Sequence, residues 1–221
     1  MIDSYLRMPF QKILFTPLGR GLTRILPNPF YYTCAALISG ILSAYFIVKG
    51  LPYVAIIFLG LSGLFDVLDG TVARISMRAS PKGAVLDITF DRLVEFSLVL
   101  GLYLYASNER AFLSILLLGS ILFCVTTFLV VSLFLDEKTE KSFTYHPGLM
   151  ERTETFFLFA LMIVFPSAFS FLGCIFVFLV TLTGGVRLFR FVGFDDPKEA
   201  KADDGGKKTP DGREGMVVEK V

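Results

Sequence analysis

The sequence predicts an all-α integral membrane protein with six transmembrane helices and an N-terminal amphipathic helix that lies on the membrane surface. The first observation is composition. The 221 residues are 54% hydrophobic with a mean hydropathy of +0.66, which exceeds the apolar share of soluble domains. The second is the length of the uncharged runs. Residues 29–48, 111–135 and 155–186 carry no charge, and about 20 apolar residues suffice to cross a bilayer.

The predicted spans follow one another with short connections. Pro166 and Ser167 interrupt the last uncharged run, which therefore suits two short or tilted helices joined by a tight turn. One further helix carries its charges, among them Asp87 and Asp91, only in its first half. The six expected spans are 29–49, 51–76, 84–106, 111–135, 149–166 and 168–191.

The two ends of the chain differ from this membrane domain, which we assign to residues 29–194. Basic and apolar residues alternate in 5–26, as in an amphipathic helix at the cytoplasmic surface, so we treat 1–28 as a juxtamembrane segment. It lacks the long apolar core of a cleavable signal. Residues 195–221 are rich in Lys, Asp, Gly and Glu and are expected to form a disordered cytoplasmic tail. Acidic residues lie between its lysines, which argues against a nucleic-acid partner.

Lysine and arginine residues predict that both termini lie in the cytoplasm, where membrane proteins concentrate positive charge. Such residues cluster before the first span, after the second and fourth spans, and at the end of the sixth. The opposite side has only Lys49 and Arg110. The connection between the second and third spans is then expected to be cytoplasmic.

Four aspartates stand at this cytoplasmic edge. Asp66 and Asp69 are i,i+3 neighbours on the second span, and Asp87 and Asp91 are i,i+4 neighbours on the third. The four carboxylates are therefore expected to meet in one polar cavity just below the interface. Charges near lipid are costly and usually functional. Four facing carboxylates need cations between them to stay ionised, and oxygen-only ligands indicate Mg²⁺ or Mn²⁺ rather than zinc.

Small and basic residues surround these aspartates. Gly70 permits close approach of a ligand or of another helix, and Ala73 keeps the same face shallow. Arg74 offers a bidentate donor that suits phosphate. Gly83 is expected to break the chain after Lys82, so that the third span can begin.

These eight residues read D-x2-D-G-x2-A-R-x8-G-x3-D-x3-D over residues 66–91. The pattern resembles the signature of the CDP-alcohol phosphatidyltransferase family, with every fixed position present. The resemblance implies a membrane enzyme that transfers a phosphatidyl group from a CDP-linked lipid, either CDP-diacylglycerol or CDP-archaeol, to an alcohol and releases CMP. It also implies a homodimer.

The resemblance assigns roles by position. Two divalent ions, Mg²⁺ or Mn²⁺, would be bound by Asp66, Asp69, Asp87 and Asp91. Asp91 would also be the general base that takes the proton of the acceptor hydroxyl. The residues bordering the CDP group would be Asp66, Asp69, Gly70, Ala73, Arg74 and Gly83. Phosphoryl transfer needs charge neutralisation and in-line positioning more than a covalent nucleophile, which agrees with a site built from carboxylates.

The acceptor alcohol must be inferred from other residues. A phosphorylated acceptor needs cations beyond Arg74, and the candidates on the same side are Lys141, Arg152, Arg187 and Arg190. The stretch G-x3-R from Gly148 to Arg152 resembles the entry of the fifth span in family members that use phosphorylated polyols. We therefore expect glycerol 3-phosphate first and inositol phosphate second. The alternative is that these cations only anchor the chain at the membrane surface.

Two other functions stay open at this stage. One is the same reaction on an unphosphorylated acceptor such as serine, inositol or an amino alcohol. The other, from a different class, is a divalent-cation transporter, although a transporter would favour acids near the bilayer midplane on discontinuous helices. The aspartates here gather at one end of their spans, beside a basic connection.

Overall fold

The computed structural model describes residues 26–135 and 152–193 of the chain. All regular structure in these residues is helical, and the prediction of an all-α fold is confirmed for them. The elements are α3 (Phe30–Val48), α4 (Pro52–Ile75), α5 (Pro81–Tyr105), α6 (Ser107–Leu135), α7 (Arg152–Val164), the 3₁₀ helix η2 (Pro166–Ala168) and α8 (Phe169–Gly193). The expected amphipathic helix within 1–28, the residue Lys141 and the tail 195–221 lie outside the described residues.

Four of these helices are long and apolar enough to cross a membrane, over Phe30–Val48, Pro52–Ile75, Ser107–Phe134 and Pro166–Val192. The helix α5 has a similar length but carries charges in its first half, and α7 has 13 residues. Many large apolar side chains on the long helices are exposed, and lipid accommodates such a surface better than water does. The chain is an integral membrane protein, and the count of six spans stays a prediction.

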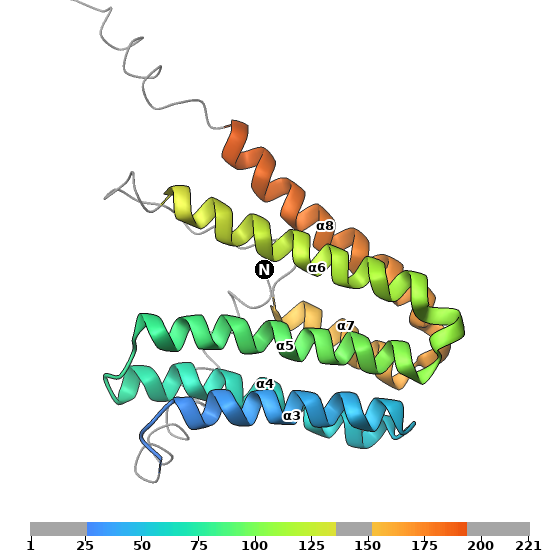
Figure 1. The fold of residues 1–221 in the computed structure, drawn as a ribbon, viewed down its shortest axis with the longest axis horizontal. Helices are drawn as coiled ribbons and strands as arrows, with labels where there is room; N and C mark the ends of the chain where they lie inside the picture. The colour runs from blue at the N-terminus through green and yellow to red at the C-terminus, as the bar shows by residue number, and fades with distance from the viewer. Residues whose placement is uncertain (1–25, 136–151, 194–221) are drawn as a thin grey trace, which may run out of the picture.

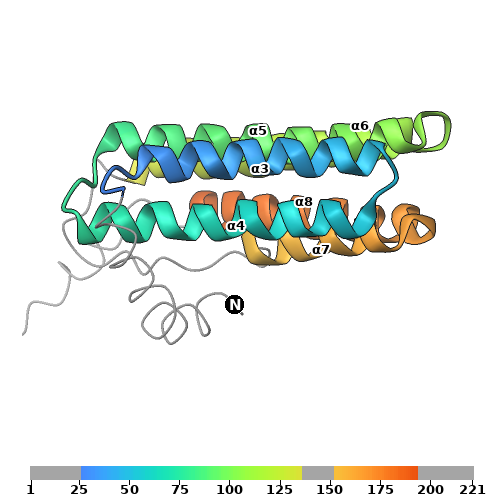
Figure 2. The ribbon, with the colours of Figure 1, turned by 90° about the horizontal axis from the view of Figure 1, so that it is seen from below.

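The helices lie along a common axis, and the chain passes repeatedly between two ends of the bundle (Figures 1 and 2). The helix α3 packs against α4 and α5, α6 packs against α8, and α7 contacts both α4 and α8. The start of α3, the connection from α4 to α5 and the end of α8 lie toward one end, which we call the aspartate end, and the shorter α7 begins about midway along the bundle with its start facing that end (Figures 1 and 2). Here α6 and α8 diverge from α5.

Small residues hold α3 close to both helices that carry the aspartates. A Cβ atom added at Gly101 of α5 would lie 2.8 Å from the carbonyl oxygen of Ala44 on α3, so only glycine permits this approach. On the other side of α3, the hydroxyl of Ser43 donates a 2.8 Å hydrogen bond to the carbonyl oxygen of Ala55 on α4. Membrane helices associate through such small and hydroxylated residues. Because both α4 and α5 pack on α3, their aspartate-bearing segments are held side by side.

The connection from α4 to α5 corrects one expectation. The helix α5 begins at Pro81, three residues before the predicted start, and Gly83 lies within its first turn instead of breaking the chain. Ser80 is the N-cap, and its hydroxyl accepts a 3.2 Å hydrogen bond from the Gly83 amide. Pro81 suits the first helical position because no hydrogen bond is needed there from its nitrogen. The chain leaves α4 through Met77, whose φ of 54° lies in the left-handed region.

The opposite end corrects a second expectation. The helix α6 begins at Ser107, before the predicted start at 111, and Arg110 is buried instead of lying in a polar loop. Its guanidinium donates hydrogen bonds to the carbonyl oxygens of Leu102, at 3.1 Å, and Pro166, at 2.8 Å. It also lies 4.2 Å from the centre of the Phe169 ring. Arg110 therefore joins the α5–α6 connection to the turn at Pro166, where the predicted break between two helices is confirmed.

Candidate active site

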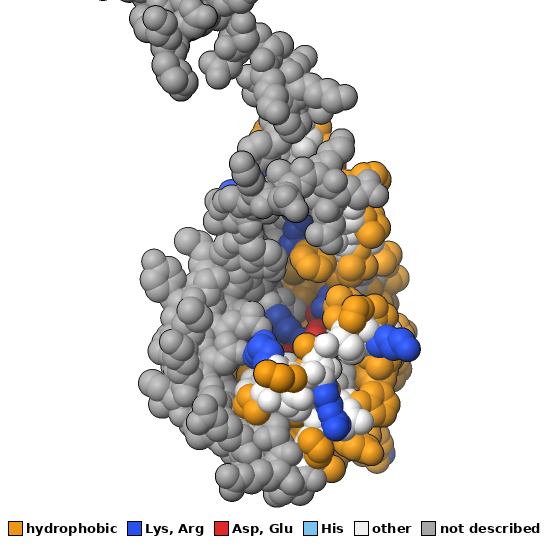
Figure 3. Space-filling view, turned by 90° about the vertical axis from the view of Figure 1, so that its left-hand side faces the viewer, with side chains coloured by type: hydrophobic (Ala, Val, Ile, Leu, Met, Phe, Trp, Pro, Cys, Tyr) orange, Lys and Arg blue, Asp and Glu red, His pale blue; other side chains and the backbone are white. Residues whose placement is uncertain are grey.

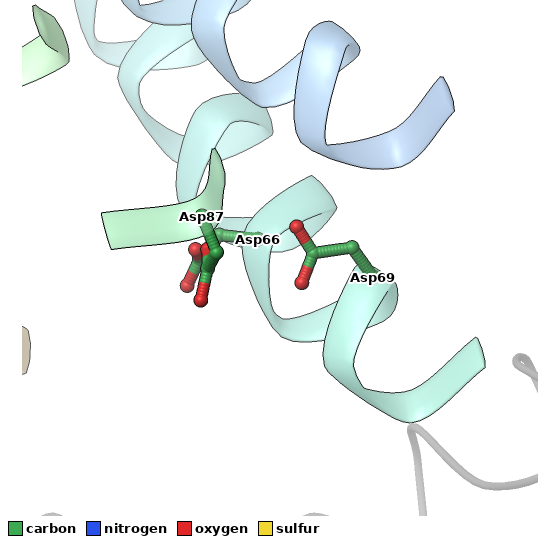
Figure 4. A group of neighbouring side chains, drawn as sticks. All are labelled: Asp66, Asp69 and Asp87. Carbon is green, nitrogen blue, oxygen red and sulfur yellow. The ribbon is translucent and has the colours of Figure 1, made fainter. Parts of the chain in front are cut away.

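Three of the predicted aspartates converge at the aspartate end. Asp66 and Asp69 lie one turn apart on α4, and Asp87 lies in the second turn of α5. Each offers a carboxylate oxygen, and these oxygens all lie within 4.8 Å of one another. Figure 4 shows the three side chains turned toward one another from the two helices. The i,i+3 spacing on α4 and the packing of α4 and α5 on α3 together produce this group.

The donor set of this group fits a divalent metal ion. All the ligand atoms are carboxylate oxygens, which Mg²⁺ and Mn²⁺ prefer. The Oδ2 atom of Asp69 and the Oδ1 atom of Asp87 are buried and have no hydrogen-bond partner among the described residues. A buried carboxylate oxygen without a partner is unfavourable unless a cation or a donor reaches it. The residues present therefore suit a bound cation.

Asp91, the fourth predicted ligand, lies outside this group of three. Its carboxylate accepts a short hydrogen bond from Arg152, and Arg152 Nη1 also lies 2.6 Å from Asp66 Oδ1. A single guanidinium thus connects α4, α5 and α7. The Arg152 side chain is 30% exposed, whereas those of Asp66 and Asp91 are 14% and 15% exposed, so water screens these ion pairs only in part.

The small residues of the signature border an open space. A Cβ atom added at Gly70 would meet only the guanidinium of Arg74, at 3.8 and 4.0 Å. Gly70 is therefore not needed for helix packing here, and a ligand can approach it. Arg74 is exposed, and its Nη2 atom lies 3.5 Å from the hydroxyl of Thr71. Ala73 is half-buried on α4, and Gly83 is exposed at the start of α5.

The two other described basic candidates, Arg187 and Arg190, lie on α8, and no ion pair among the described residues joins them to the aspartates. Arg187, near the end of α8, donates a 3.0 Å hydrogen bond to the carbonyl oxygen of Cys124 on α6 and lies 5.2 Å from the centre of the Phe128 ring. Arg190 is exposed one turn further along α8. The structure thus brings Arg152 alone of the described acceptor candidates onto the carboxylates.

One ion pair without a role predicted from the sequence lies one turn deeper than Asp91 on α5. Arg92 Nη1 lies 2.7 Å from Glu95 Oε2, and Glu95 is buried. The spacing from Asp87 through Asp91 to Glu95, four residues each time, already placed a third acid on the same face of α5. Glu95 therefore extends the acidic face of α5 toward the interior of the bundle.

The assembled site is open at the aspartate end of the molecule. Figure 3 looks onto this end and shows acidic side chains at the bottom of a recess, with Lys and Arg side chains near its rim. Carboxylates at depth and cations around them suit a ligand that carries phosphate groups and reaches the carboxylates through metal ions.

Comparison with known proteins identifies the class. The sequence profile of the CDP-alcohol phosphatidyltransferase family matches residues 24–184, and the chain belongs to this family. It is therefore a transferase of phospholipid biosynthesis, which moves a phosphatidyl group from a CDP-linked lipid to an alcohol with release of CMP. This membership removes the support for a cation transporter.

Three curated proteins illustrate the similarity: one inner membrane protein and two synthases of inositol phosphate lipids. The chain is 30% identical to the Escherichia coli inner membrane protein YnjF over 196 residues, which are 86% of this chain and 94% of that protein. It is 28% identical to the phosphatidylinositol phosphate synthase of Corynebacterium glutamicum over 70% of each chain. It is also 32% identical to the archaetidylinositol phosphate synthase of Aeropyrum pernix over 94 residues, 42% of this chain and 47% of that protein.

Solved structures support the fold. The crystal structure of Mycobacterium tuberculosis phosphatidylinositol phosphate synthase with CDP-DAG bound has a TM-score of 0.62 at 23% identity, covering 81% of this chain and 94% of that one. The structure of the same enzyme with manganese and citrate has a TM-score of 0.69 at 21% identity, covering 81% and 90%. At this identity the likeness establishes the shared helical fold.

Proposed function

We propose that the protein transfers the phosphatidyl group of a CDP-linked lipid to a hydroxyl of a phosphorylated polyol, with inositol phosphate as the first candidate. The observation that carries the proposal is the convergence of the Asp66, Asp69 and Asp87 carboxylates beside the guanidinium of Arg152. Two relatives are named as synthases of an inositol phosphate lipid, one of archaetidylinositol phosphate and one of phosphatidylinositol phosphate. Their names reverse the order expected from the sequence, which placed glycerol 3-phosphate first.

The carboxylates serve to hold divalent ions. Asp66, Asp69 and Asp87 supply the converging oxygens, and Asp91 stands next to them on α5. When bound, two such ions, Mg²⁺ or Mn²⁺, neutralise the diphosphate of the donor and stabilise the CMP that leaves. Arg74, exposed beside the open side of Gly70, binds a phosphate of the donor through its bidentate guanidinium. Ala73 and Gly83 border the CDP group without filling its place.

Asp91 takes the proton of the acceptor hydroxyl. The acceptor oxygen forms a bond to the phosphorus that carries the lipid, and the bond from that phosphorus to the oxygen bridging to CMP breaks. Asp91 is suited to the proton transfer because it lies at the edge of the carboxylate group and next to Arg152, the candidate for the acceptor phosphate. A base and a phosphate-binding cation side by side orient the acceptor toward the donor.

The acceptor phosphate is bound by Arg152 together with Arg187, and Arg190, exposed one turn further along α8, adds positive charge. Lys141 lies outside the described residues and stays a candidate from the sequence. Arg187 lies near the end of α8 and is hydrogen-bonded to the carbonyl oxygen of Cys124 on α6. At this end α6 and α8 diverge from α5 (Figure 1). A planar guanidinium can bind two phosphate oxygens at once, which a lysine cannot. An unphosphorylated acceptor would offer no anionic group to these two guanidinium groups.

We also propose that the aspartate end faces the cytoplasm and that the chain works as a homodimer with six spans. Arg74, Arg78 and Lys82 lie in or beside the α4–α5 connection, whereas Arg110 at the opposite end is buried. The orientation is tested with two variants, Ser80→Cys and Ser167→Cys, each with its introduced cysteine as the single cysteine of the chain. They are labelled with a maleimide that does not cross membranes, and only Ser167→Cys should react from outside intact cells. A separate experiment, crosslinking in native membranes, tests the dimer.

An acceptor panel tests the reaction. The full chain, purified in detergent, is supplied with CDP-diacylglycerol, Mg²⁺ or Mn²⁺, and one of inositol 1-phosphate, glycerol 3-phosphate, inositol or serine. Mass spectrometry measures the lipid product and CMP. We expect conversion of inositol 1-phosphate by the wild type and none by Asp91→Asn. Conversion of serine or inositol in preference to both phosphorylated acceptors would contradict the proposed acceptor class and leave the transferase chemistry standing.

A further inference from the structure

We propose that Arg152 is a built-in counter-cation of the carboxylate group that competes with the metal ions, and that metal binding releases it to the acceptor phosphate. This inference rests on the proposed function, because it takes the aspartates as metal ligands and Arg152 as an acceptor residue. It adds an order to that function: the site becomes able to bind the acceptor tightly once the metal ions are in place.

The contacts of one nitrogen atom carry the inference. Arg152 Nη1 lies 2.6 Å from Asp66 Oδ1 and donates a hydrogen bond to Asp91 Oδ2. Asp66 is also one of the three residues whose oxygens converge within 4.8 Å. The guanidinium therefore occupies oxygen atoms of two residues that are proposed to bind the metal ions. A cation at the same oxygens must displace it or be excluded by it.

Electrostatic repulsion makes it unfavourable for Arg152 and a metal ion to bind the carboxylates at the same time. Like charges a few ångströms apart repel strongly where water is scarce, and the side chains of Asp66 and Asp91 are 14% and 15% exposed. Arg152 itself is 30% exposed, so it can reach the recess without unfolding α7. Its guanidinium also lies 5.4 Å from the centre of the Phe156 ring, one turn further along α7, while it contacts the carboxylates.

The released guanidinium has an obvious partner in the proposed reaction. The acceptor phosphate must lie near Asp91, because Asp91 takes the proton of the acceptor hydroxyl. Arg152 begins from a position in contact with Asp91 and has a bidentate geometry that fits phosphate. Metal and acceptor phosphate then bind cooperatively through one side chain, and each must strengthen the binding of the other by the same factor.

Arg187 provides a matched control. It is an arginine of the same end and a proposed acceptor residue, yet its guanidinium is hydrogen-bonded to the carbonyl oxygen of Cys124. None of the ion pairs among the described residues joins it to an aspartate. Removing Arg187 therefore removes a phosphate contact and leaves the competition for the carboxylates intact.

The test is a titration of Mn²⁺ into the detergent-purified full chain, with free Mn²⁺ measured by electron paramagnetic resonance. We expect Arg152→Ala to bind Mn²⁺ about tenfold more tightly than the wild type, the factor for losing one charge-assisted competitor. Arg187→Ala should bind Mn²⁺ as the wild type does. Saturating inositol 1-phosphate should tighten Mn²⁺ binding in the wild type and in Arg187→Ala, but not in Arg152→Ala. Circular dichroism checks the fold, and Arg152→Gln serves if the alanine variant does not fold.

The outcomes separate this inference from the function on which it rests. If Arg152→Ala and Arg152→Gln bind Mn²⁺ as weakly as the wild type or more weakly, Arg152 orients the metal ligands instead of competing, and the inference is overturned. Tighter Mn²⁺ binding in Arg152→Ala, with no effect of inositol 1-phosphate on any protein, supports the competition and contradicts the proposed acceptor. If the wild type binds no Mn²⁺, or if Asp69→Asn binds Mn²⁺ as tightly as the wild type, both the inference and the proposed metal site are overturned.

Discussion

Arg110 offers a sharp test of how the opposite end of the bundle is held together. Replacing it with alanine removes hydrogen bonds to the carbonyl oxygens of Leu102 and Pro166 and a ring contact at 4.2 Å with Phe169. Hydrogen bonds between membrane helices contribute about 1 kcal/mol each, with more for a charged donor, and a desolvated cation–π contact contributes about 1 kcal/mol. The two carbonyl oxygens are also left without their partner.

The expected loss in the free energy of unfolding is about 3 kcal/mol, the sum of two hydrogen bonds and one ring contact. The truncation also enlarges a partly open pocket of about 140 Å³ that Arg110 and Pro166 help to line. The activity of the molecules that remain folded should not change, because Arg110 lies at the end opposite the aspartates.

Unfolding by SDS in mixed micelles, followed by circular dichroism, measures this loss. Lys49→Ala is the control, since Lys49 is an exposed cation of the same end that faces the Tyr45 ring at 5.5 Å. Arg110→Lys should fall between the two, because an ammonium group cannot reach both carbonyl oxygens from one planar fork. Equal unfolding midpoints for Arg110→Ala and Lys49→Ala would refute the reasoning.

Three other changes test the packing and the site. Asp69→Asn should raise the unfolding midpoint without metal, since Asp69 is a buried carboxylate beside two others. The same variant should lose most of the stabilisation by Mn²⁺. For the wild type, mass action sets that stabilisation at about 2.7 kcal/mol when the Mn²⁺ concentration is 100 times Kd. Gly101→Ala should destabilise by about 1–3 kcal/mol and lower kcat, because its Cβ would meet the carbonyl oxygen of Ala44 at 2.8 Å. Gly119→Ala, where nothing lies within 4 Å, is the neutral control for the same assays. Ser80→Ala should cost about 1 kcal/mol in capping, seen as faster amide exchange in the first turn of α5, and unchanged exchange there would contradict the cap.

Local sequence pattern was sufficient to predict the long helices and to place Asp66, Asp69 and Asp87 near one another. Uncharged runs marked the long apolar helices, because a span must satisfy its backbone internally and expose apolar side chains to lipid. The break at Pro166 followed from proline geometry. Asp66, Asp69 and Asp87 could be placed on facing helix surfaces, because helical spacing alone decides which side chains share a face. Their roles as ligands stay predictions.

The predicted helix boundaries were less accurate where a charged side chain forms hydrogen bonds with groups that are distant in the sequence. The helix α6 starts before the predicted position because Arg110, read as a loop cation, is buried among carbonyl oxygens of two connections. A charged residue in a sequence indicates a solvent-exposed loop only if no group in the folded protein can bind its side chain. Pro166, whose carbonyl oxygen accepts a hydrogen bond from Arg110, stands 56 residues away in the chain.

The sequence by itself determined the membrane class, the helical periodicity and the eight residues of the signature, since each depends on composition or on spacing within a single helix or its neighbour. Only the tertiary structure decided which cation meets the carboxylates. Arg152 stands 61 residues after Asp91, and the sequence offered it as one of four basic candidates, favoured only by the G-x3-R stretch at the entry of the fifth span. The packing of α7 against α4 and of α3 against α5 selected Arg152, because a contact between distant segments is fixed by the three-dimensional packing of helices and not by any local period.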